Sequence, residues 1–244
     1  MNATNRLSDR ICFITGSSRG IGLAAARALA GRGAAVILHG RDSLRLRAEC
    51  EKLPDPSRHR YVAADLAKVE EVLYLADEVS RRQGRLDVLI HCAGALGPRV
   101  PIGEYPPDEW NRVIQVNLTA PFLLTRGLRP ALRQGENPAV LFVSSGAGKS
   151  GKAGWGAYAV SKFGLEGLAQ VLAAELGPEG IRVNTVDPGP TRTRMRAKAY
   201  PDEDALTLPT PEEITPVFIH LAAPRSRLHA ERLDARAFAV GREG

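Results

Sequence analysis

The sequence predicts an α/β protein in which helices cover both faces of a parallel β-sheet. Short apolar runs typical of buried strands alternate with helical segments six times, and the connections between them are short. Such alternation is typical of right-handed crossovers, which make successive strands parallel. A chain of 244 residues is long enough for one such domain and short for two. We therefore expect one domain, residues 1–244, built on a doubly wound sheet of about seven strands.

The apolar runs predicted as strands are, in chain order, 11–15, 34–39, 61–65, 87–91, 139–143 and 181–187. Helices are expected near 23–30, 42–53, 68–83, 107–132, 157–176 and 211–223, the last with Thr210 as its N-cap. In a parallel sheet, ligands bind beyond the carboxyl ends of the strands. The residues that follow such ends include Gly16, Asp65, Gly94, Ser145 and Pro188.

Composition excludes several classes of protein. Hydrophobic residues make up 44% of the chain, yet no apolar run approaches the roughly 20 residues of a membrane span, and residues 1–10 are polar, without a secretory apolar segment. A cytoplasmic protein with no membrane partner is expected. Cys12, Cys50 and Cys92 are odd in number and lack Cys-x-x-Cys spacing, which favours buried reduced thiols over disulfides or metal ligands.

The net charge of +6 is concentrated at the start of the chain. Residues 1–60 hold eleven Lys and Arg against five Asp and Glu, which accounts for the whole excess. This stretch contains neither a long basic helix nor a basic patch interleaved with aromatic residues, so nucleic acid is a weak interpretation. An anionic cofactor is the better one.

A glycine turn follows the first predicted strand. Gly16, Gly20 and Gly22 lie between that strand and a helix, which is the context that a dinucleotide-binding turn requires. Glycines allow the backbone to turn tightly against a pyrophosphate, whose charge sits on the N–H groups at the helix N-terminus. The spacing is Gly-x-x-x-Gly-x-Gly and differs from the commoner Gly-x-Gly-x-x-Gly.

Two arginines favour NADP(H) over NAD(H). The second predicted strand ends at Gly40-Arg41, where the adenosine ribose of a cofactor would lie, and Arg19 is in the glycine turn nearby. A carboxylate at this position would bind a free 2′-hydroxyl, whereas two guanidinium groups suit a 2′-phosphate. The alternative, that Arg41 opens the next helix in solvent, stays open for either arginine alone.

Three polar side chains can meet after the fifth predicted strand. Tyr158 and Lys162 are four residues apart and share one helix face, and the loop can fold Ser145 back over them. A phenol of pKa about 10 is a poor base at neutral pH, but a nearby ammonium group favours the phenolate. Tyr158 is then a candidate general acid and base, and Ser145 a hydrogen-bond donor. Taken alone, Tyr-x-x-x-Lys is more often one solvated helix face.

Together these motifs resemble the short-chain dehydrogenase/reductase family, in its form of roughly 250 residues. Six elements agree in order and spacing over residues 9–193: residues 15–22, Asp65-Leu66, Cys92-Ala93-Gly94, Asn117, Ser145 thirteen residues before Tyr158-x-x-x-Lys162, and Pro188-Gly189. The resemblance implies a Rossmann-type fold and an NADP(H)-dependent oxidoreductase that acts on a small carbonyl or alcohol. Residues 191–204 also look like a subgroup of uncharacterised bacterial oxidoreductases.

The resemblance implies a role for each catalytic residue. Tyr158 would exchange a proton with the substrate oxygen, which Ser145 would polarise. Lys162 would hold the nicotinamide ribose and lower the pKa of Tyr158. Asn117 would distort its own helix and hold a water that links Lys162 to solvent.

The cofactor contacts follow from the same resemblance, and no metal is implied. Thr191, through its backbone N–H, and Thr193, through its hydroxyl, would orient the carboxamide and the diphosphate. The expected cofactor-binding residues are Gly16, Ser18, Arg19, Gly20, Ile21, Gly22, Arg41, Asp65, Leu66, Ala93, Gly94, Asn117, Tyr158, Lys162, Pro188, Gly189, Thr191 and Thr193.

Two departures from the family pattern stand out. His91 replaces the usual Asn, which should change hydrogen bonding under the adenosine side more than the chemistry. The Val-Asp-Gly-Gly-like end of the last strand is missing, and residues 232–236 are the closest candidate. That strand and helix 211–223 commonly form a subunit interface in the family. The prediction of a homotetramer is therefore weaker than that of a homodimer formed through helices 107–132 and 157–176.

The substrate pocket is expected between segments 95–107, 149–155 and 192–208, with Trp155 as an apolar wall. Residues 190–210 form a substrate-binding loop that we expect to close as a lid, since the loop is polar and lacks periodicity. The basic residues of this loop alternate in sequence, as along one edge of a strand or loop, and could bind an anionic substrate. The favoured interpretation is that they are solvated or pair with the acidic residues at 202–204. These residues are Arg192, Arg194, Arg196 and Lys198.

Two other functions remain open. Arg126, Arg129 and Arg133 share one helical face and could dock an acidic carrier protein, as in a 3-oxoacyl-(acyl-carrier-protein) reductase, although a solvated face is favoured. A cofactor-binding scaffold or redox sensor without turnover is the second alternative, because one fold hosts many functions. The sequence leaves open the substrate, the direction of reaction and the choice between dimer and tetramer.

Overall fold

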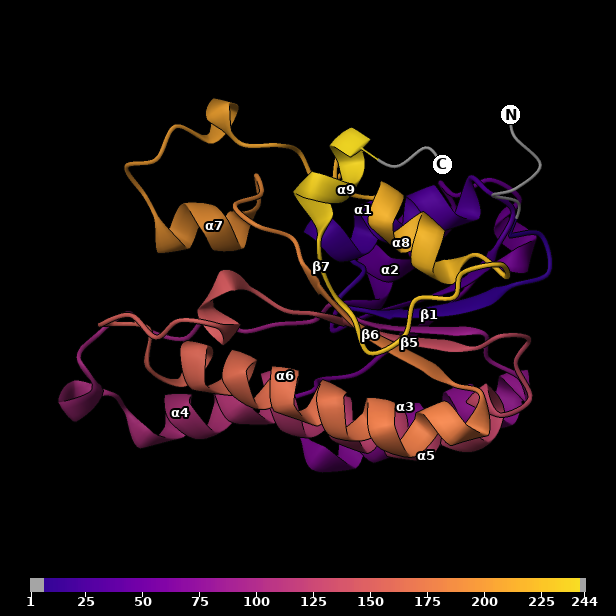
Figure 1. Ribbon diagram of the computed structural model, residues 1–244, viewed down its shortest axis with the longest axis horizontal. Helices are drawn as coiled ribbons and strands as arrows, with labels where there is room; N and C mark the ends of the chain where they lie inside the picture. The colour runs from indigo at the N-terminus through magenta and orange to yellow at the C-terminus, as the bar shows by residue number, and fades with distance from the viewer. Residues whose placement is uncertain (1–6, 242–244) are drawn as a thin grey trace.

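The computed structural model describes residues 7–241, which form one seven-stranded sheet in the order β3-β2-β1-β4-β5-β6-β7 (Figure 1). Every pair of neighbouring strands is parallel. The chain runs outward from β1 to β3, then returns to the other side of β1 at β4 and continues to β7. The strands are β1 (Ile11–Thr15), β2 (Ala35–Gly40), β3 (Arg60–Ala63), β4 (Val88–His91), β5 (Ala139–Val143), β6 (Arg182–Asp187) and β7 (Arg232–Asp234).

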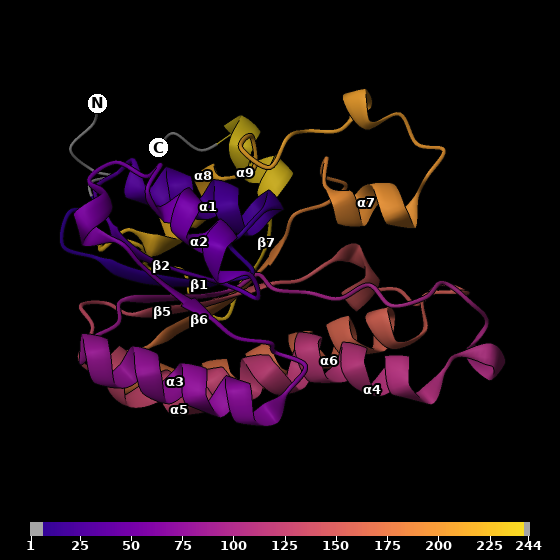
Figure 2. The ribbon, with the colours of Figure 1, turned by 180° about the vertical axis from the view of Figure 1, so that it is seen from behind.

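Helices cover both faces of the sheet, as Figures 1 and 2 show. One layer contains α1 (Gly20–Ala30), α2 (Ser43–Cys50), α8 (Pro216–Ala222) and α9 (Ala235–Gly241). The opposite layer contains α3 (Val69–Gln83), α4 (Pro107–Ile114), α5 (Ala120–Leu132) and α6 (Gly156–Leu176). The short helix α7 (Arg194–Ala199) lies beyond the end of the sheet, on the side of α1 and α8. The predicted doubly wound α/β fold is confirmed.

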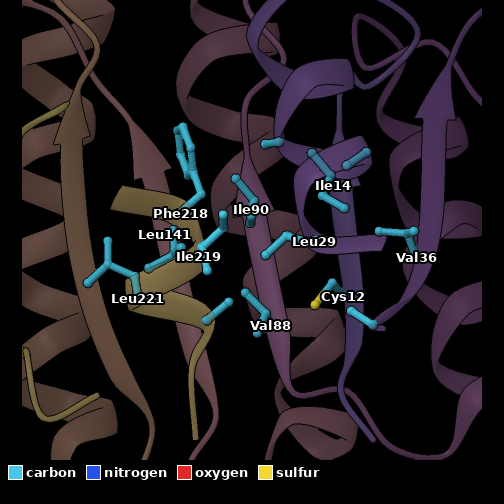
Figure 3. Packing of buried hydrophobic residues seen from close by; sticks show 14 of the residues in the cluster. Cys12, Ile14, Leu29, Val36, Val88, Ile90, Leu141, Phe218, Ile219 and Leu221 are labelled. Carbon is cyan, nitrogen blue, oxygen red and sulfur yellow. The ribbon is translucent and has the colours of Figure 1, made fainter. Parts of the chain in front are cut away.

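Two hydrophobic cores separate the sheet from its helix layers. Because successive strand residues point to opposite faces, Cys12 and Ile14 of β1 belong to the core under α1 and α8, whereas Phe13 belongs to the core under α3 and α5. Figure 3 shows the first core, where Leu29 and Phe218 from the helices meet the strand side chains. Burial of both faces explains why the central strands β1, β4 and β5 are largely apolar runs.

The predicted helix over residues 107–132 is divided in three. A π-helix, η4 (Gln115–Thr119), separates α4 from α5, and the N–H of Ala120 donates to the carbonyl of Gln115. Single π-helical turns of this kind occur frequently at functional sites. Asn117 lies within this turn, so the expectation that its helix is distorted there is confirmed.

Two predicted elements near the C-terminus differ from the structure. The helix expected over 211–223 begins only at Pro216, because proline has no N–H to donate to a preceding turn and is favoured at the first helical position. Thr210 and Glu213 still bond each other, and the N–H of Thr210 donates to Glu213 Oε2 at 2.6 Å. The last strand covers Arg232–Asp234 and is followed directly by α9.

The burial expected of the cysteines is found for two of the three. Cys12 and Cys50 are buried, Cys92 is half-buried, and all three are free. Over residues 7–241, none of the helices combines the length and the apolar character that crossing a membrane requires.

His91, the residue that departs from the family pattern, is buried at the end of β4. Its ring stacks on Phe142 with 4.8 Å between centroids, and Nε2 lies 2.8 Å from Thr125 Oγ1. Among the described residues Nδ1 has no hydrogen-bond partner. Burial lowers the pKa of His91 to about 3, so the ring is neutral near pH 7.

We expect His91→Asn to make stability less sensitive to acid. The folded-state pKa lies below the ordinary 6.5, so as the pH falls only the unfolded chain gains a proton and stability is lost. Between pH 7 and pH 5, denaturant unfolding should show that the wild type loses about 2 kcal/mol more than the variant. Equal losses would contradict the assignment of a buried, neutral His91.

Candidate active site

The glycine turn between β1 and α1 packs against the residues that follow β4. Gly16 has a φ of +68°, and a Cβ placed on it would lie 2.7 Å from Ala93 Cα, a distance that side chains do not adopt. A Cβ on Gly22 would lie 2.6 Å from the Gly16 carbonyl oxygen. Glycine is therefore required at both positions. Because no side chain of the described residues caps the α1 N-terminus, its first N–H groups can meet an anion.

Side chains that the sequence did not single out fix this turn. His39 Nδ1 accepts a hydrogen bond from the N–H of Gly16 at 3.2 Å, and His39 Nε2 donates to the carbonyl of Ala64 at 3.2 Å. Burial lowers the pKa of His39 to about 4, which keeps Nδ1 free to accept. On the other side, Thr15 Oγ1 accepts from the N–H groups of Cys92 and Ala93, at 3.0 and 3.1 Å.

The two arginines predicted at the adenosine end lie on adjacent, exposed segments. A Cβ on Gly40 would lie 3.1 Å from the Ser18 side chain, so the end of β2 touches the glycine turn beside Arg19 and Arg41. Arg45 is a third guanidinium nearby, and its Nε donates to the carbonyl of Ser18 at 2.9 Å. The next carboxylate, Asp42, is used as the N-cap of α2.

Asp65 and Leu66 lie in the turn after β3. Asp65 Oδ1 accepts from the N–H of Ala67 at 3.0 Å, and the N–H of Asp65 donates to Glu71 at 2.6 Å. Leu66 is buried, and its carbonyl accepts from Gln115 Nε2 at 3.1 Å. This turn therefore contacts the π-helix that carries Asn117.

Asn117 is buried and joins three elements. Its Oδ1 accepts from the N–H of Ala95 at 2.7 Å, and its Nδ2 donates to the carbonyl of Ala95 and to Ser161 Oγ, both at 2.9 Å. The side chain thus holds the loop after β4, including Gly94, against α6. Both N–H groups of this amide are engaged within the protein. Asn117 is not a surface amide.

Ser145, Tyr158 and Lys162 meet where β5 ends and α6 begins. Tyr158 is 8% exposed and Lys162 is 5% exposed, so the interpretation of Tyr-x-x-x-Lys as a solvated face is wrong. Lys162 Nζ donates to the carbonyl of Val143 at 2.8 Å and lies 5.8 Å from the centroid of the Tyr158 ring. The hydroxyl of Ser145 is hydrogen-bonded to Tyr158 and also accepts from the N–H of Ala147 at 3.2 Å.

The expected lowering of the Tyr158 pKa is wrong for this structure. Burial raises the pKa of Tyr158 above its ordinary value, the hydrogen bond from Ser145 opposes this, and the Asp187 carboxylate adds to it. Lys162 does not reverse the shift, because its ammonium is directed to the Val143 carbonyl and burial lowers its own pKa to about 8. The phenol is therefore protonated at neutral pH.

The turn after β6 leads from Pro188 and Gly189 back over the glycine turn. Thr191 Oγ1 donates to the carbonyl of Pro188 at 3.1 Å. Thr193 Oγ1 accepts from the N–H of Arg196 at 3.1 Å and caps α7, a use of this hydroxyl that the sequence did not suggest. The methyl carbon of Thr193 lies 3.7 Å from the position that a Cβ on Gly20 would take. Segment 188–193 and the glycine turn therefore face each other.

A cavity of about 350 Å³ adjoins this edge. It is lined by residues from all three segments that were predicted to surround a substrate: Leu96, Gly97, Pro98, Arg99, Gly154, Lys198, Ala199 and Pro201. Leu96 and Ala199 belong to the same hydrophobic cluster as Tyr158, so two residues of the cavity lining link the cavity to the phenol.

The predicted substrate loop contains a helix. The proposal that its basic residues alternate along a strand or loop is wrong, because Thr193 caps α7 and residues 194–199 are helical. Arg196 pairs with Glu203 at 2.6 Å and stacks on Tyr200, which confirms the expected pairing with the acids at 202–204. Arg99 closes the other side: its guanidinium lies 4.8 Å from the centroid of Trp155 and donates to the carbonyl of Ala199.

The three arginines considered for carrier-protein docking are only partly free. Arg129 and Arg133 both pair with Glu179, which follows α6, whereas Arg126 is exposed. One carboxylate therefore offsets part of the positive charge on this face.

Comparison with known proteins gives consistent results. A family model described as short chain dehydrogenase matches residues 10–204. The uncharacterized oxidoreductase YciK of Escherichia coli K12 is 42% identical over 225 residues, which cover 91% of this chain and 89% of YciK. D-threitol dehydrogenase of Mycolicibacterium smegmatis is 34% identical over 230 residues, 89% of this chain and 87% of that protein. A short chain dehydrogenase from Shigella flexneri, crystallised with NADP, superposes with a TM-score of 0.90 at 39% identity and covers 96% of this chain and 99% of its own.

Proposed function

Because the chain belongs to the short chain dehydrogenase family, we propose that it is an NADP(H)-dependent oxidoreductase acting on a small carbonyl or alcohol. The observation that carries this proposal is the group of Ser145 with the buried Tyr158 and Lys162, in which Ser145 is hydrogen-bonded to Tyr158 and the Lys162 amine lies 5.8 Å from the centroid of the Tyr158 ring. The NADP bound to the Shigella flexneri relative supports the choice of cofactor. A non-catalytic scaffold or sensor would not need the three polar groups together, so turnover is favoured.

The residues at the edge of the sheet fit a dinucleotide. The glycine turn, which Gly16 and Gly22 allow to pack tightly, leads into the uncapped start of α1, and these N–H groups suit a diphosphate. Arg19 and Arg41 would hold a 2′-phosphate, which favours NADP(H) over NAD(H). When bound, the nicotinamide supplies or accepts the hydride. The remaining residues expected to hold it are Ser18, Gly20, Ile21, Asp65, Leu66, Ala93, Gly94, Asn117, Tyr158, Lys162, Pro188, Gly189, Thr191 and Thr193.

In carbonyl reduction, Tyr158 would give its proton to the substrate oxygen. The raised pKa keeps this proton in place at neutral pH, so the phenol is in the form that reduction requires. Ser145 would donate a hydrogen bond to the same oxygen. The phenolate left behind would lie near the Lys162 ammonium, whose charge stabilises it. Asn117 would act by holding the Ala95 loop and Ser161 in place.

A small substrate suits the cavity better than a carrier-bound chain. A volume of about 350 Å³ lies at the small end of ligand pockets. The threitol dehydrogenase relative is named for a small alcohol. A 3-oxoacyl-(acyl-carrier-protein) reductase is the second candidate, but Arg129 and Arg133 are occupied by Glu179. We assign the whole chain to one domain, with residues 190–210 as the lid over the substrate.

We further propose a cytoplasmic homodimer. The buried, unpaired thiols of Cys12 and Cys50 suit a reducing compartment. Large apolar side chains are exposed on the outer faces of α5 and α6, including Phe122, Phe163 and Val171, the last of them 54% exposed. Exposed apolar side chains on these two helices suit a two-fold interface. A homotetramer would also need the region of α8 and β7.

We expect Tyr158→Phe to lower kcat at least about 100-fold, because the proton donor is removed. The dissociation constant of NADPH, measured by fluorescence titration, should change little. Reduction would be followed by NADPH absorbance with a panel of ketones, aldehydes and 3-oxoacyl thioesters. Tyr74→Phe, an exposed phenol on α3, serves as the control. Undiminished turnover in Tyr158→Phe would rule out the proposed mechanism.

We expect Arg41→Asp to shift preference from NADPH toward NADH by at least about ten-fold in kcat/KM, because a carboxylate repels the 2′-phosphate and accepts from a free hydroxyl. The matched control is Arg32→Asp, the same charge change after the far end of α1. A wild type that already prefers NADH, or a variant with unchanged preference, would show the cofactor assignment to be wrong.

We expect Val171→Asp to convert a dimer into a monomer, because a charge placed in an apolar interface loses its hydration. Light scattering after size exclusion would measure the mass at micromolar concentration. Leu44→Asp on α2 places the same charge at an exposed apolar site outside α5 and α6. A monomeric wild type, or a dimeric Val171→Asp, would contradict this interface.

A further inference from the structure

One guanidinium from the last strand joins three elements of the candidate site. Arg232 Nη2 donates to the carbonyl of Ser145 and to Asp187 Oδ2, both at 3.0 Å. Its Nε donates to Glu166 Oε1 at 2.7 Å. The side chain therefore reaches from β7 to the loop after β5, to the end of β6 and to α6. Glu166 is one turn after Lys162 on α6.

The acceptors of Arg232 are themselves fixed. Glu166 accepts from Ser144 Oγ and, at 3.0 Å, from Thr185 Oγ1. Asp187 Oδ1 accepts from the N–H of Gly189 at 3.0 Å, which shapes the turn after β6. The network thus begins at the loop that carries Ser145 and ends at the turn that carries Gly189.

This network is largely removed from water. The side chains of Arg232, Glu166 and Asp187 are 20%, 12% and 16% exposed. An Arg that bonds several acceptors in such surroundings holds them in a defined geometry, whereas an exposed pair adds little. It also balances two carboxylates near Lys162, both of which raise the pKa of that amine against the effect of burial.

We propose that Arg232 is a positioning residue for the active site. By holding the Ser145 carbonyl and Asp187 together, it sets the Ser145 hydroxyl against Tyr158 and fixes the start of the turn at 188–189. This role rests on the proposed function of the trio.

A double-mutant cycle tests whether Arg232 acts through Ser145. With NADPH and the best substrate of the panel, Arg232→Met should lower kcat at least about ten-fold in the wild-type background, since small misplacements of catalytic groups are costly. In the Ser145→Ala background the same change should cost less than about three-fold, because the positioned hydroxyl is absent. Equal losses in both backgrounds would overturn the proposal.

Two further variants separate positioning from general stability. Arg232→Lys keeps the positive charge but can reach fewer of the three acceptors, so its kcat should lie between those of Arg232→Met and the wild type. If Arg232→Met does not fold, Arg232→Lys takes its place in the cycle. Arg129→Met removes an arginine that pairs with a glutamate outside the site, and its kcat should equal that of the wild type. A loss in Arg129→Met as large as in Arg232→Met would count against a specific role.

Hydrogen exchange gives a readout that does not need turnover. The N–H of Gly148 donates to the Ser145 carbonyl and that of Gly189 to Asp187, so Arg232→Met should speed exchange in segments 144–150 and 186–192. Segment 69–83 is the internal control. Unchanged exchange would overturn the positioning role even in an active enzyme. A wild type without turnover on any substrate, but with faster exchange in the variant, would reject the proposed function and retain the positioning contacts.

Discussion

The parallel pairing of all the strands in the sheet is the constraint on which the rest of the structure depends. Because every strand points the same way, the loops after β1, β4, β5 and β6 leave from one edge. The glycine turn and the loop after β4 meet where the strand order reverses, and they can meet only because Gly16 has no side chain to strike Ala93. The backbone therefore brings the candidate catalytic and cofactor-binding residues of these loops to one edge of the sheet.

Several polar groups at this edge are buried and held by specific partners. The ammonium of Lys162 is satisfied by the Val143 carbonyl, the amide of Asn117 by Ala95 and Ser161, and the carboxylates of Glu166 and Asp187 by Arg232. Unpaired groups in such surroundings would be costly, so the network is rigid as well as polar. The same burial keeps the Tyr158 phenol neutral, which makes it a proton donor rather than a base before reaction.

Much of this arrangement could be predicted from the sequence, because it depends on residues that lie close together along the chain. Apolar runs fixed the strands, the glycine spacing indicated the turn after β1, and the place of Asn117 indicated a distorted helix. What could not be predicted depends on contacts between distant residues. The direction of the Tyr158 pKa shift follows from burial and from Asp187, and the contact of Arg232 with Ser145 spans β7 and β5. The helix α7 was missed because it is short and lacks an apolar stripe, so only its Thr193 cap signals it.

The central claim is that Tyr158 and Ser145 face the nicotinamide at this edge. A crystal structure of the protein with NADPH tests it most directly. We expect the diphosphate at Gly16–Gly22, the 2′-phosphate between Arg19 and Arg41, and the nicotinamide in contact with the Tyr158 oxygen beside Ser145. A nicotinamide bound away from that oxygen, with the phenol still directed into the cluster of Leu96 and Ala199, would contradict the account.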